Sequence, residues 1–160
     1  MTTKTIVCDL NHDDLVNLFS TASYGSNWLT FGKNGKDYYG TELEDKKDCV
    51  EDTWAKVLLS GKSIYMADCY AEDETEFYGD KPHEWKNNGH RCYMRYTLCL
   101  DDIKTGLERA IDGTFNHDED DDVSYVKDAA FRFINDDSGF DICDAEIIMQ
   151  IVCFNEVVYG

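Results

Sequence analysis

The segment from residue 144 to residue 154 carries apolar side chains nearly all the way round a helix. These residues are Ala145, Ile147, Ile148, Met149, Ile151, Val152 and Phe154. A helix that is apolar on every side is stable only when it is buried on more than one side. The segment therefore predicts a helix at the centre of a core, with Asp144 as the residue that caps its start.

Four earlier stretches have the apolar spacing of helices with one buried face. The first follows Asn11, a predicted N-cap, and ends at Gly25; the second spans 50–59 and stops at Ser60-Gly61. The third runs from Asp101 to Gly113, and the fourth follows the acidic run 118–122. Their predicted buried residues are Leu15, Leu18, Phe19 and Ala22; Val50, Trp54, Val57 and Leu58; Ile103, Leu107, Ala110 and Ile111; and Val126, Ala130, Phe133 and Ile134.

Strands are predicted where apolar and polar residues alternate. Residues 4–10, 62–70 and 90–100 have this pattern, and 75–79 is expected to return along 62–70 as a hairpin. The stretch 80–89 contains the only proline and an Asn-Asn-Gly turn signal, so it reads as a turn region. Residues 32–48 read as a loop.

These elements predict an α+β fold with a small antiparallel sheet of about four strands packed with about five helices. A hairpin requires that at least part of the sheet is antiparallel. No repeat or linker divides the 160 residues, so the chain is expected to form a single domain over 1–160.

The formal net charge of −18 comes from 33 acidic and 15 basic residues. This charge repels nucleic acid and anionic membranes, which carry the same sign, so neither is an expected partner. It attracts basic surfaces of other proteins. The alternative is that the charge only keeps the protein soluble.

Seven cysteines are present, an odd number, and none forms a Cys-x-x-Cys pair. The start lacks an apolar signal segment, and no stretch is long and apolar enough to cross a bilayer. These features favour a reducing cytoplasm, with thiols acting as small buried apolar groups. Cys8, Cys92 and Cys153 lie in apolar-periodic segments and fit that expectation.

No motif for metal, phosphate or nucleophile chemistry is present. His90, Cys92 and Cys99 lack the paired ligands of a zinc site. The run from Asp118 fails as a calcium loop, because its sixth and twelfth positions are Val123 and Ala129. No cofactor is expected, and we predict a protein that is not an enzyme; an enzyme without a recognisable motif is the minor alternative.

Two candidate binding regions stand out. Rows of carboxylates can imitate the phosphates of a duplex, which carries one charge per ~1.7 Å of axis, and so occupy the basic groove of a nucleic-acid-binding protein. The residues of this acidic surface are Glu72, Asp73, Glu74, Glu76, Asp118, Glu119, Asp120, Asp121 and Asp122. The alternative is a pocket that sequesters a nucleotide signal by stacking and phosphate contacts, within region 24–47. Its residues are Tyr24, Trp28, Lys33, Lys36, Tyr38 and Tyr39.

The two ends of the chain resemble a family of small uncharacterised phage and prophage proteins of gut Firmicutes. The stretch LNHDDLVNLFSTA at 10–22 with YGSNW at 24–28 is similar to the family's start, and DAEIIMQIVCFNEVVYG at 144–160 to its end. The family has no established activity, so the resemblance implies a setting rather than site residues. In that setting, small acidic proteins often resemble anti-defence factors, including anti-CRISPR and antirestriction proteins. The resemblance implies a cytoplasmic host protein that binds nucleic acid as the partner.

Overall fold

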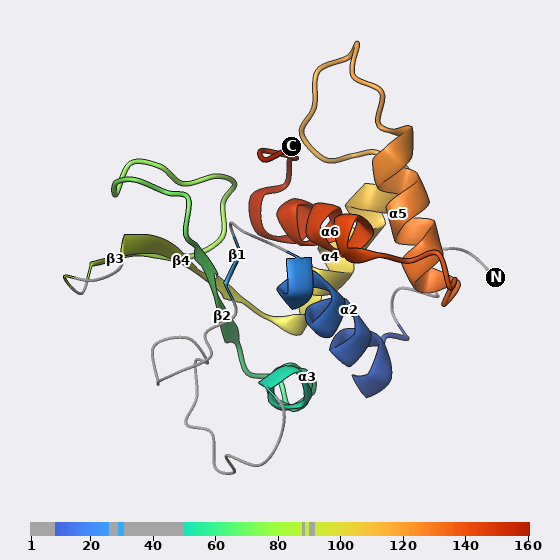
Figure 1. Ribbon diagram of the computed structural model, residues 1–160, viewed down its shortest axis with the longest axis horizontal. Coiled ribbons are helices and arrows are strands. Elements are labelled where there is room, and N and C mark those ends of the chain that lie inside the picture. Colours follow the sequence, from blue (N-terminus) through green and yellow to red (C-terminus); the bar gives the residue numbers. More distant parts are fainter. Residues whose placement is uncertain (1–8, 26–28, 31–49, 88, 90–91) are drawn as a thin grey trace.

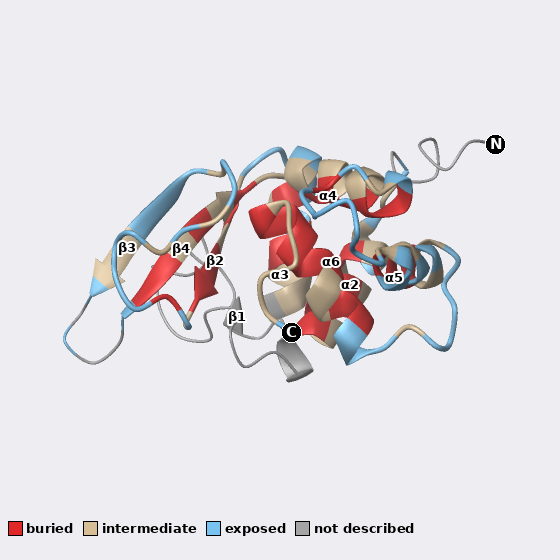
Figure 2. Ribbon diagram, turned by 90° about the horizontal axis from the view of Figure 1, so that it is seen from above, coloured by how far each residue is buried: buried red, intermediate tan, exposed pale blue. Residues whose placement is uncertain are grey.

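In the computed structural model, the described residues form a sheet of four antiparallel strands with helices packed beside it (Figures 1 and 2). The structure describes residues 9–25, 29–30, 50–87, 89 and 92–160. Within these ranges the helices are α2 (His12–Gly25), α3 (Val50–Leu59), α4 (Leu100–Asp112), α5 (Ser124–Ile134) and α6 (Ile142–Phe154). The strands are β1 (Leu29–Thr30), β2 (Ile64–Asp68), β3 (His83–Asn87) and β4 (Cys92–Leu98). The predicted α+β class is confirmed.

The sheet has the order β1-β2-β4-β3, so β4 lies inside it and β3 forms an edge. Ile64 pairs with Leu98 at one end of β2, and Asp68 pairs with Met94 at the other. Ile64, Met66, Met94, Tyr96 and Leu98 are buried in the main core. The alternation predicted for 90–100 therefore places Met94, Tyr96 and Leu98 in the core as expected, whereas Cys92 is exposed.

The predicted hairpin between 62–70 and 75–79 is wrong. Residues 75–79 form no strand, and β2 pairs with β1 and β4 instead. The reason is local: the backbone N–H of Glu72 donates to the Glu76 carboxylate, and that of Thr75 donates to the Asp73 carboxylate. Such side-chain acceptors hold a turn and compete with strand pairing.

Strand β3 lies in the stretch that was predicted as a turn region. Its residues are largely exposed, because it is an edge strand whose polar side chains have little core to face. Apolar alternation therefore could not reveal it. The predicted strand 4–10 falls mostly outside the described residues, and Asp9 and Leu10 are not in a strand. The predicted loop 32–48 also lies outside them.

Helix α6 lies at the centre of the helical layer and contacts α2, α4 and α5 (Figure 2). Its last six residues, from Met149 to Phe154, are all buried. This placement confirms the expectation drawn from its all-round apolar surface. Gly106 of α4 allows the closest approach, because a Cβ there would lie 2.5 Å from Cγ2 of Val152.

Polar side chains cap α2, α4 and α6, in part at positions other than those predicted. Asn11 caps α2 as expected, exchanging hydrogen bonds with Asp14. For α6 the cap is Asp141, and Asp144 is the third helical residue that completes a reciprocal pair with it. For α4 the flanking residue is Cys99, whose N–H donates to Asp102, so Asp101 is not the cap.

The thiols do not all behave as buried apolar groups. Cys153 is buried in the core as expected, and burial raises the pKa of its thiol. Cys92 and Cys143 are exposed, so the expectation for Cys92 is wrong. Cys8 lies outside the described residues. In the described part of the chain, no helix is long and apolar enough to span a membrane.

Candidate functional site

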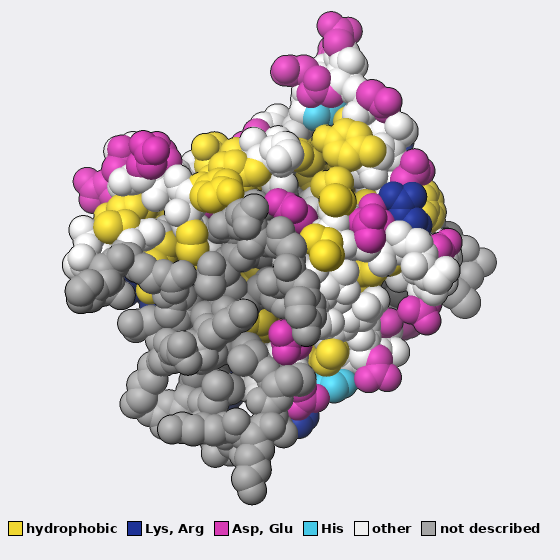
Figure 3. Space-filling view, viewed as in Figure 1, with side chains coloured by type: hydrophobic (Ala, Val, Ile, Leu, Met, Phe, Trp, Pro, Cys, Tyr) yellow, Lys and Arg dark blue, Asp and Glu magenta, His cyan; other side chains and the backbone are white. Residues whose placement is uncertain are grey.

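Both predicted acidic runs lie on connections that project from the same side of the molecule (Figure 1). Glu72, Asp73, Glu74 and Glu76 belong to the β2–β3 connection, and Asp118 to Asp122 belong to the α4–α5 connection. The segment after α6 passes between the two connections (Figure 1). Acidic side chains gather over both, with hydrophobic side chains between them (Figure 3). All nine predicted residues are exposed except Glu76, which is partly buried.

The β2–β3 connection is held by its own carboxylates. The hydroxyl and N–H of Thr75 donate to Asp73 and hold the pKa of its carboxyl below the usual value. The Glu76 carboxylate accepts the N–H of Glu72 at 2.9 Å. These hydrogen bonds favour the ionised form of Asp73 and hold the backbone of the loop in place.

Aromatic rings accompany these carboxylates. Tyr70 is 49% exposed and Phe77 is 44% exposed. The Phe77 ring stacks on His83 with centroids 4.0 Å apart, and the Tyr70 ring meets Tyr159 edge-on at 5.3 Å. These contacts fix the orientation of two exposed rings beside an acidic loop.

The α4–α5 connection begins where Gly113 ends α4 in the left-handed conformation, with φ 71°. Asp118 and Asp121 then form a turn: the Asp121 N–H donates to the Asp118 carbonyl at 3.0 Å, and the Asp118 N–H donates to the Asp121 carboxylate at 3.1 Å. Asp122 accepts from the hydroxyl and N–H of Ser124 at the start of α5, which lowers the pKa of its carboxyl. Negative charge is favourable at that helix N-terminus.

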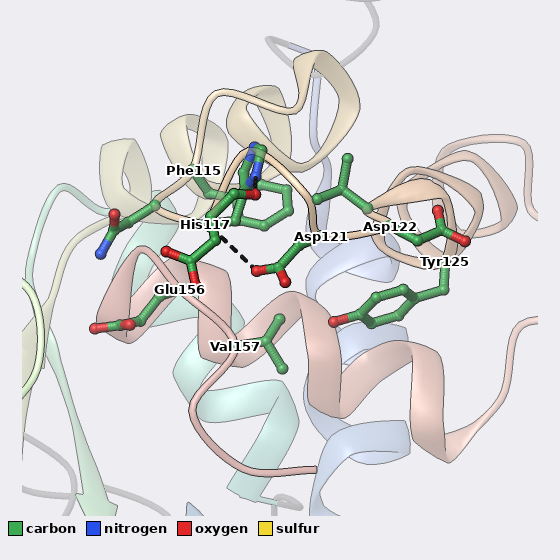
Figure 4. Close-up of a pocket in the computed structure, with 10 residues that line it drawn as sticks. Phe115, His117, Asp121, Asp122, Tyr125, Glu156 and Val157 are labelled. Atoms are coloured by element: carbon green, nitrogen blue, oxygen red, sulfur yellow. Dashed lines mark hydrogen bonds between the residues drawn. The ribbon is translucent and has the colours of Figure 1, made fainter.

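A groove runs from the α4–α5 connection across the segment after α6 to the end of the β2–β3 connection. It consists of two adjoining hollows of about 500 and about 570 Å³ that share Phe115, Asn116, His117 and Glu156. In Figure 4, Phe115 and His117 lie on one side, Tyr125 and Val157 on the other, and the Asp121 carboxylate lies between them. We call this the acidic groove. Its carboxylates are Asp80, Asp118, Asp121, Asp122 and Glu156.

A close backbone contact brings the β2–β3 connection into the groove. Gly79 has φ 72°, and a Cβ there would lie 2.8 Å from the Phe154 carbonyl oxygen. Only glycine fits such an approach with a positive φ. This contact places Asp80 in the hollow that Glu156 also lines.

The segment after α6, which forms one wall, is held by two buried polar groups. The Gln150 side-chain oxygen accepts the N–H groups of Val158 and Tyr159, each at 2.8 Å. The Tyr159 hydroxyl donates to the fully buried carboxylate of Asp68 at 2.8 Å. Burial raises the pKa of Asp68 and of Tyr159. The wall is therefore fixed to both α6 and the sheet.

Among the lining residues that the structure describes, the acidic groove has no lysine or arginine. Its carboxylates do not meet as a metal cage: no group of three or more His, Cys, Asp or Glu side chains in the described ranges could hold an ion. Asp80 pairs with Lys81, with 3.9 Å between Nζ and Oδ1. A groove lined by several carboxylates and aromatic rings suits cationic side chains of another protein, which bring their own positive charge.

The structure does not describe the alternative ligand pocket. Trp28, Lys33, Lys36, Tyr38 and Tyr39 lie outside the described residues, as does the side chain of Tyr24. His90, which was considered as a zinc ligand, also lies outside the described residues. Sequence reasoning missed Asp80 and Glu156, because each is a single carboxylate that only the tertiary fold brings to the groove. Sequence reasoning also missed His117, because a histidine among carboxylates is equally well explained as a solvated surface residue.

Comparison with known proteins adds no family: no protein-family model, curated protein or solved structure matches the chain.

Proposed function

We propose that this is a non-enzymatic anti-defence protein of a phage or other mobile element. It binds a basic, nucleic-acid-binding protein in the host cytoplasm and blocks it, as anti-CRISPR and antirestriction proteins do. The observation that carries the proposal is the acidic groove, in which five carboxylates from three separate segments line two adjoining hollows. The resemblance of the two ends to phage and prophage proteins supplies the setting.

The charge distribution supports a protein partner with a basic surface. A net charge of −18 speeds encounter with a basic surface and opposes approach to nucleic acid. Exposed carboxylates on the two connections provide the steering field, and the groove between them provides a place where lysine or arginine side chains are desolvated. Charges at such a centre decide specificity more than charges scattered over a surface.

Exposed aromatic rings support a protein interface in particular. Tyrosine and arginine dominate the binding energy of protein interfaces, and arginine stacks on aromatic rings. Tyr70 and Phe77 beside one loop, and Tyr125 in the groove with 45% exposure, place rings among the carboxylates. This pairing fits arginine-rich surfaces that normally hold nucleic acid.

The test is capture from a lysate of a gut Firmicutes host with the tagged protein, at low and at raised salt, with bound proteins identified by mass spectrometry. We expect a nucleic-acid-binding protein that is retained at low salt and released by salt or by competing duplex DNA. Retention that neither salt nor DNA reverses, or no retained nucleic-acid-binding protein at low salt, would overturn the proposal.

A further inference from the structure

His117 makes two hydrogen-bond contacts that require opposite ring nitrogens. Its Nδ1 lies 2.9 Å from the Asp118 carbonyl oxygen, and its Nε2 lies 3.0 Å from the Gly113 carbonyl oxygen. Both oxygens are acceptors. A neutral imidazole has one N–H and one lone pair, whereas the imidazolium has two N–H groups. Only the imidazolium therefore donates to both carbonyls.

The two carbonyls lie at opposite ends of the segment 113–118. Gly113 is the residue that ends α4, and Asp118 begins the acidic run. The Asp118 carbonyl also accepts the Asp121 N–H, so the histidine and the turn at 118–121 share one acceptor. The side chain of His117 thus ties the acidic run to the end of a helix.

We propose that His117 is a proton-dependent clasp on the acidic groove. As the imidazolium it bridges Gly113 and Asp118 and orders the α4–α5 connection; on losing a proton it keeps one bond and releases the other. A role for this clasp in partner binding rests on the proposed function. The ordering of the α4–α5 connection by His117 does not depend on it.

The surrounding charges favour the bridged form. The carbonyl of Asp118 and then that of Gly113 raise the pKa of His117, with smaller contributions from the carboxylates of Asp121 and Asp118. Desolvation by burial opposes them. The charged side chain of Lys127 in α5 also lies at this end of α4, since its Nζ would be 3.4 Å from a Cβ on Gly113. Other carboxylates that share the groove with His117 are Asp80, Asp122 and Glu156.

The raised pKa of His117 decides how the order of the α4–α5 connection changes with pH. The histidine binds its proton more tightly in the ordered loop than in a disordered one, whose pKa is about 6.5. The ordering is therefore fully present below about pH 6.5 and is lost as the pH rises through the higher pKa of the ordered loop. The step removes one positive charge from the groove as it loosens the loop.

The test is amide hydrogen exchange of the free protein across pH 5.5 to 9, corrected for intrinsic rates, beside an NMR titration of the His117 ring. The reporting amides are those of Asn116, which donates to the Asn155 carbonyl at 2.8 Å, and of Asp121. We expect their protection to fall about two- to tenfold, the value of one net hydrogen bond, with the midpoint of the His117 titration.

Two variants make the test specific. His117→Gln should remove the pH step and leave the protection low throughout, whereas His83→Gln should keep the step, because His83 contacts a single carbonyl, that of Lys81. Protection that does not change with pH in the wild type, or that changes equally in His117→Gln, would overturn the clasp. Neither measurement needs a partner, so failure here is distinguishable from failure of the proposed function.

Discussion

Asp68 and Asp144 are the two carboxylates buried in the described part of the chain, and each meets the cost of burial in its own way. Asp144 faces a cation: the Arg132 guanidinium donates to both of its oxygens, each at 2.7 Å. Asp68 faces neutral donors, the Tyr159 hydroxyl and the Tyr70 N–H. The charge of Asp144 is offset by its counter-ion, whereas for Asp68 desolvation outweighs the hydrogen bonds from neutral donors and raises the pKa.

Replacing Asp144 by asparagine should destabilise the protein by about 1–3 kcal/mol, because one charge-assisted bond of a two-pronged pair is lost and a guanidinium is left without its anion. Chemical denaturation measures this loss. Asp128→Asn is the matched control, since that carboxylate is exposed one helical turn before Arg132, and should change stability by no more than about 0.5 kcal/mol. Equal losses in both variants would contradict the assigned role of the pair.

Asp68 predicts a pH dependence of the opposite kind from a salt-bridged carboxylate. Its folded pKa lies above the unfolded value of about 3.9, so the native state takes up the proton first. Its contribution to stability therefore grows as the pH falls through the folded pKa and is complete below the unfolded value. The stability difference between wild type and Asp68→Asn, measured by denaturation from pH 7 to pH 4, should shift in favour of the wild type. A constant difference would show that burial does not raise this pKa.

At the scale of elements, the helices were predictable because a buried face repeats at helical spacing. Trp54 and Leu58 of α3, and Leu107 and Ala110 of α4, lie where the spacing placed them. Strand β3 was not predictable, because an edge strand needs no apolar alternation. The prediction of a strand at 75–79 was wrong, because hydrogen bonds from the backbone N–H groups of Glu72 and Thr75 to nearby carboxylates favour a turn there.

The contact between α4 and α6 gives a prediction at this scale. Gly106→Ala should lower the free energy of unfolding by roughly 1–2 kcal/mol, since overpacking outweighs the better helix propensity of alanine. The new Cβ would lie 2.5 Å from Cγ2 and 2.8 Å from Cα of Val152. The loss should be smaller in a Val152→Ala background, by at least about 0.5 kcal/mol in a double-mutant cycle. Additive losses would contradict a direct contact.

At the scale of the whole molecule, three of the five groove carboxylates, Asp118, Asp121 and Asp122, belong to the predicted acidic residues, whereas the predicted residues at 72–76 do not line the groove. The runs 72–76 and 118–122 were visible as local charge, and both are exposed on one side of the protein. The groove between them was not visible, because it depends on the Gly79 contact and on the segment that Gln150 holds. Single carboxylates in a chain with 33 acidic residues give no signal until the fold brings them together.

The central claim is that the acidic groove, rather than net charge, binds the basic partner. A groove variant replaces one carboxylate from each contributing segment: Asp80→Asn, Asp118→Asn and Glu156→Gln. A control variant removes the same charge at Asp9, Asp13 and Asp136, exposed residues at the start of α2 and the end of α5. Both variants change the formal net charge from −18 to −15, since each replaces three acidic residues.

The measurement is the affinity of the captured host protein for wild type, groove variant and control variant at one low salt concentration. Each exposed ion pair contributes about 0.2–1 kcal/mol, so three at one centre should weaken binding of the groove variant by about tenfold, and the control by no more than about threefold. Equal weakening by both variants would show that overall charge, and not the groove, holds the partner.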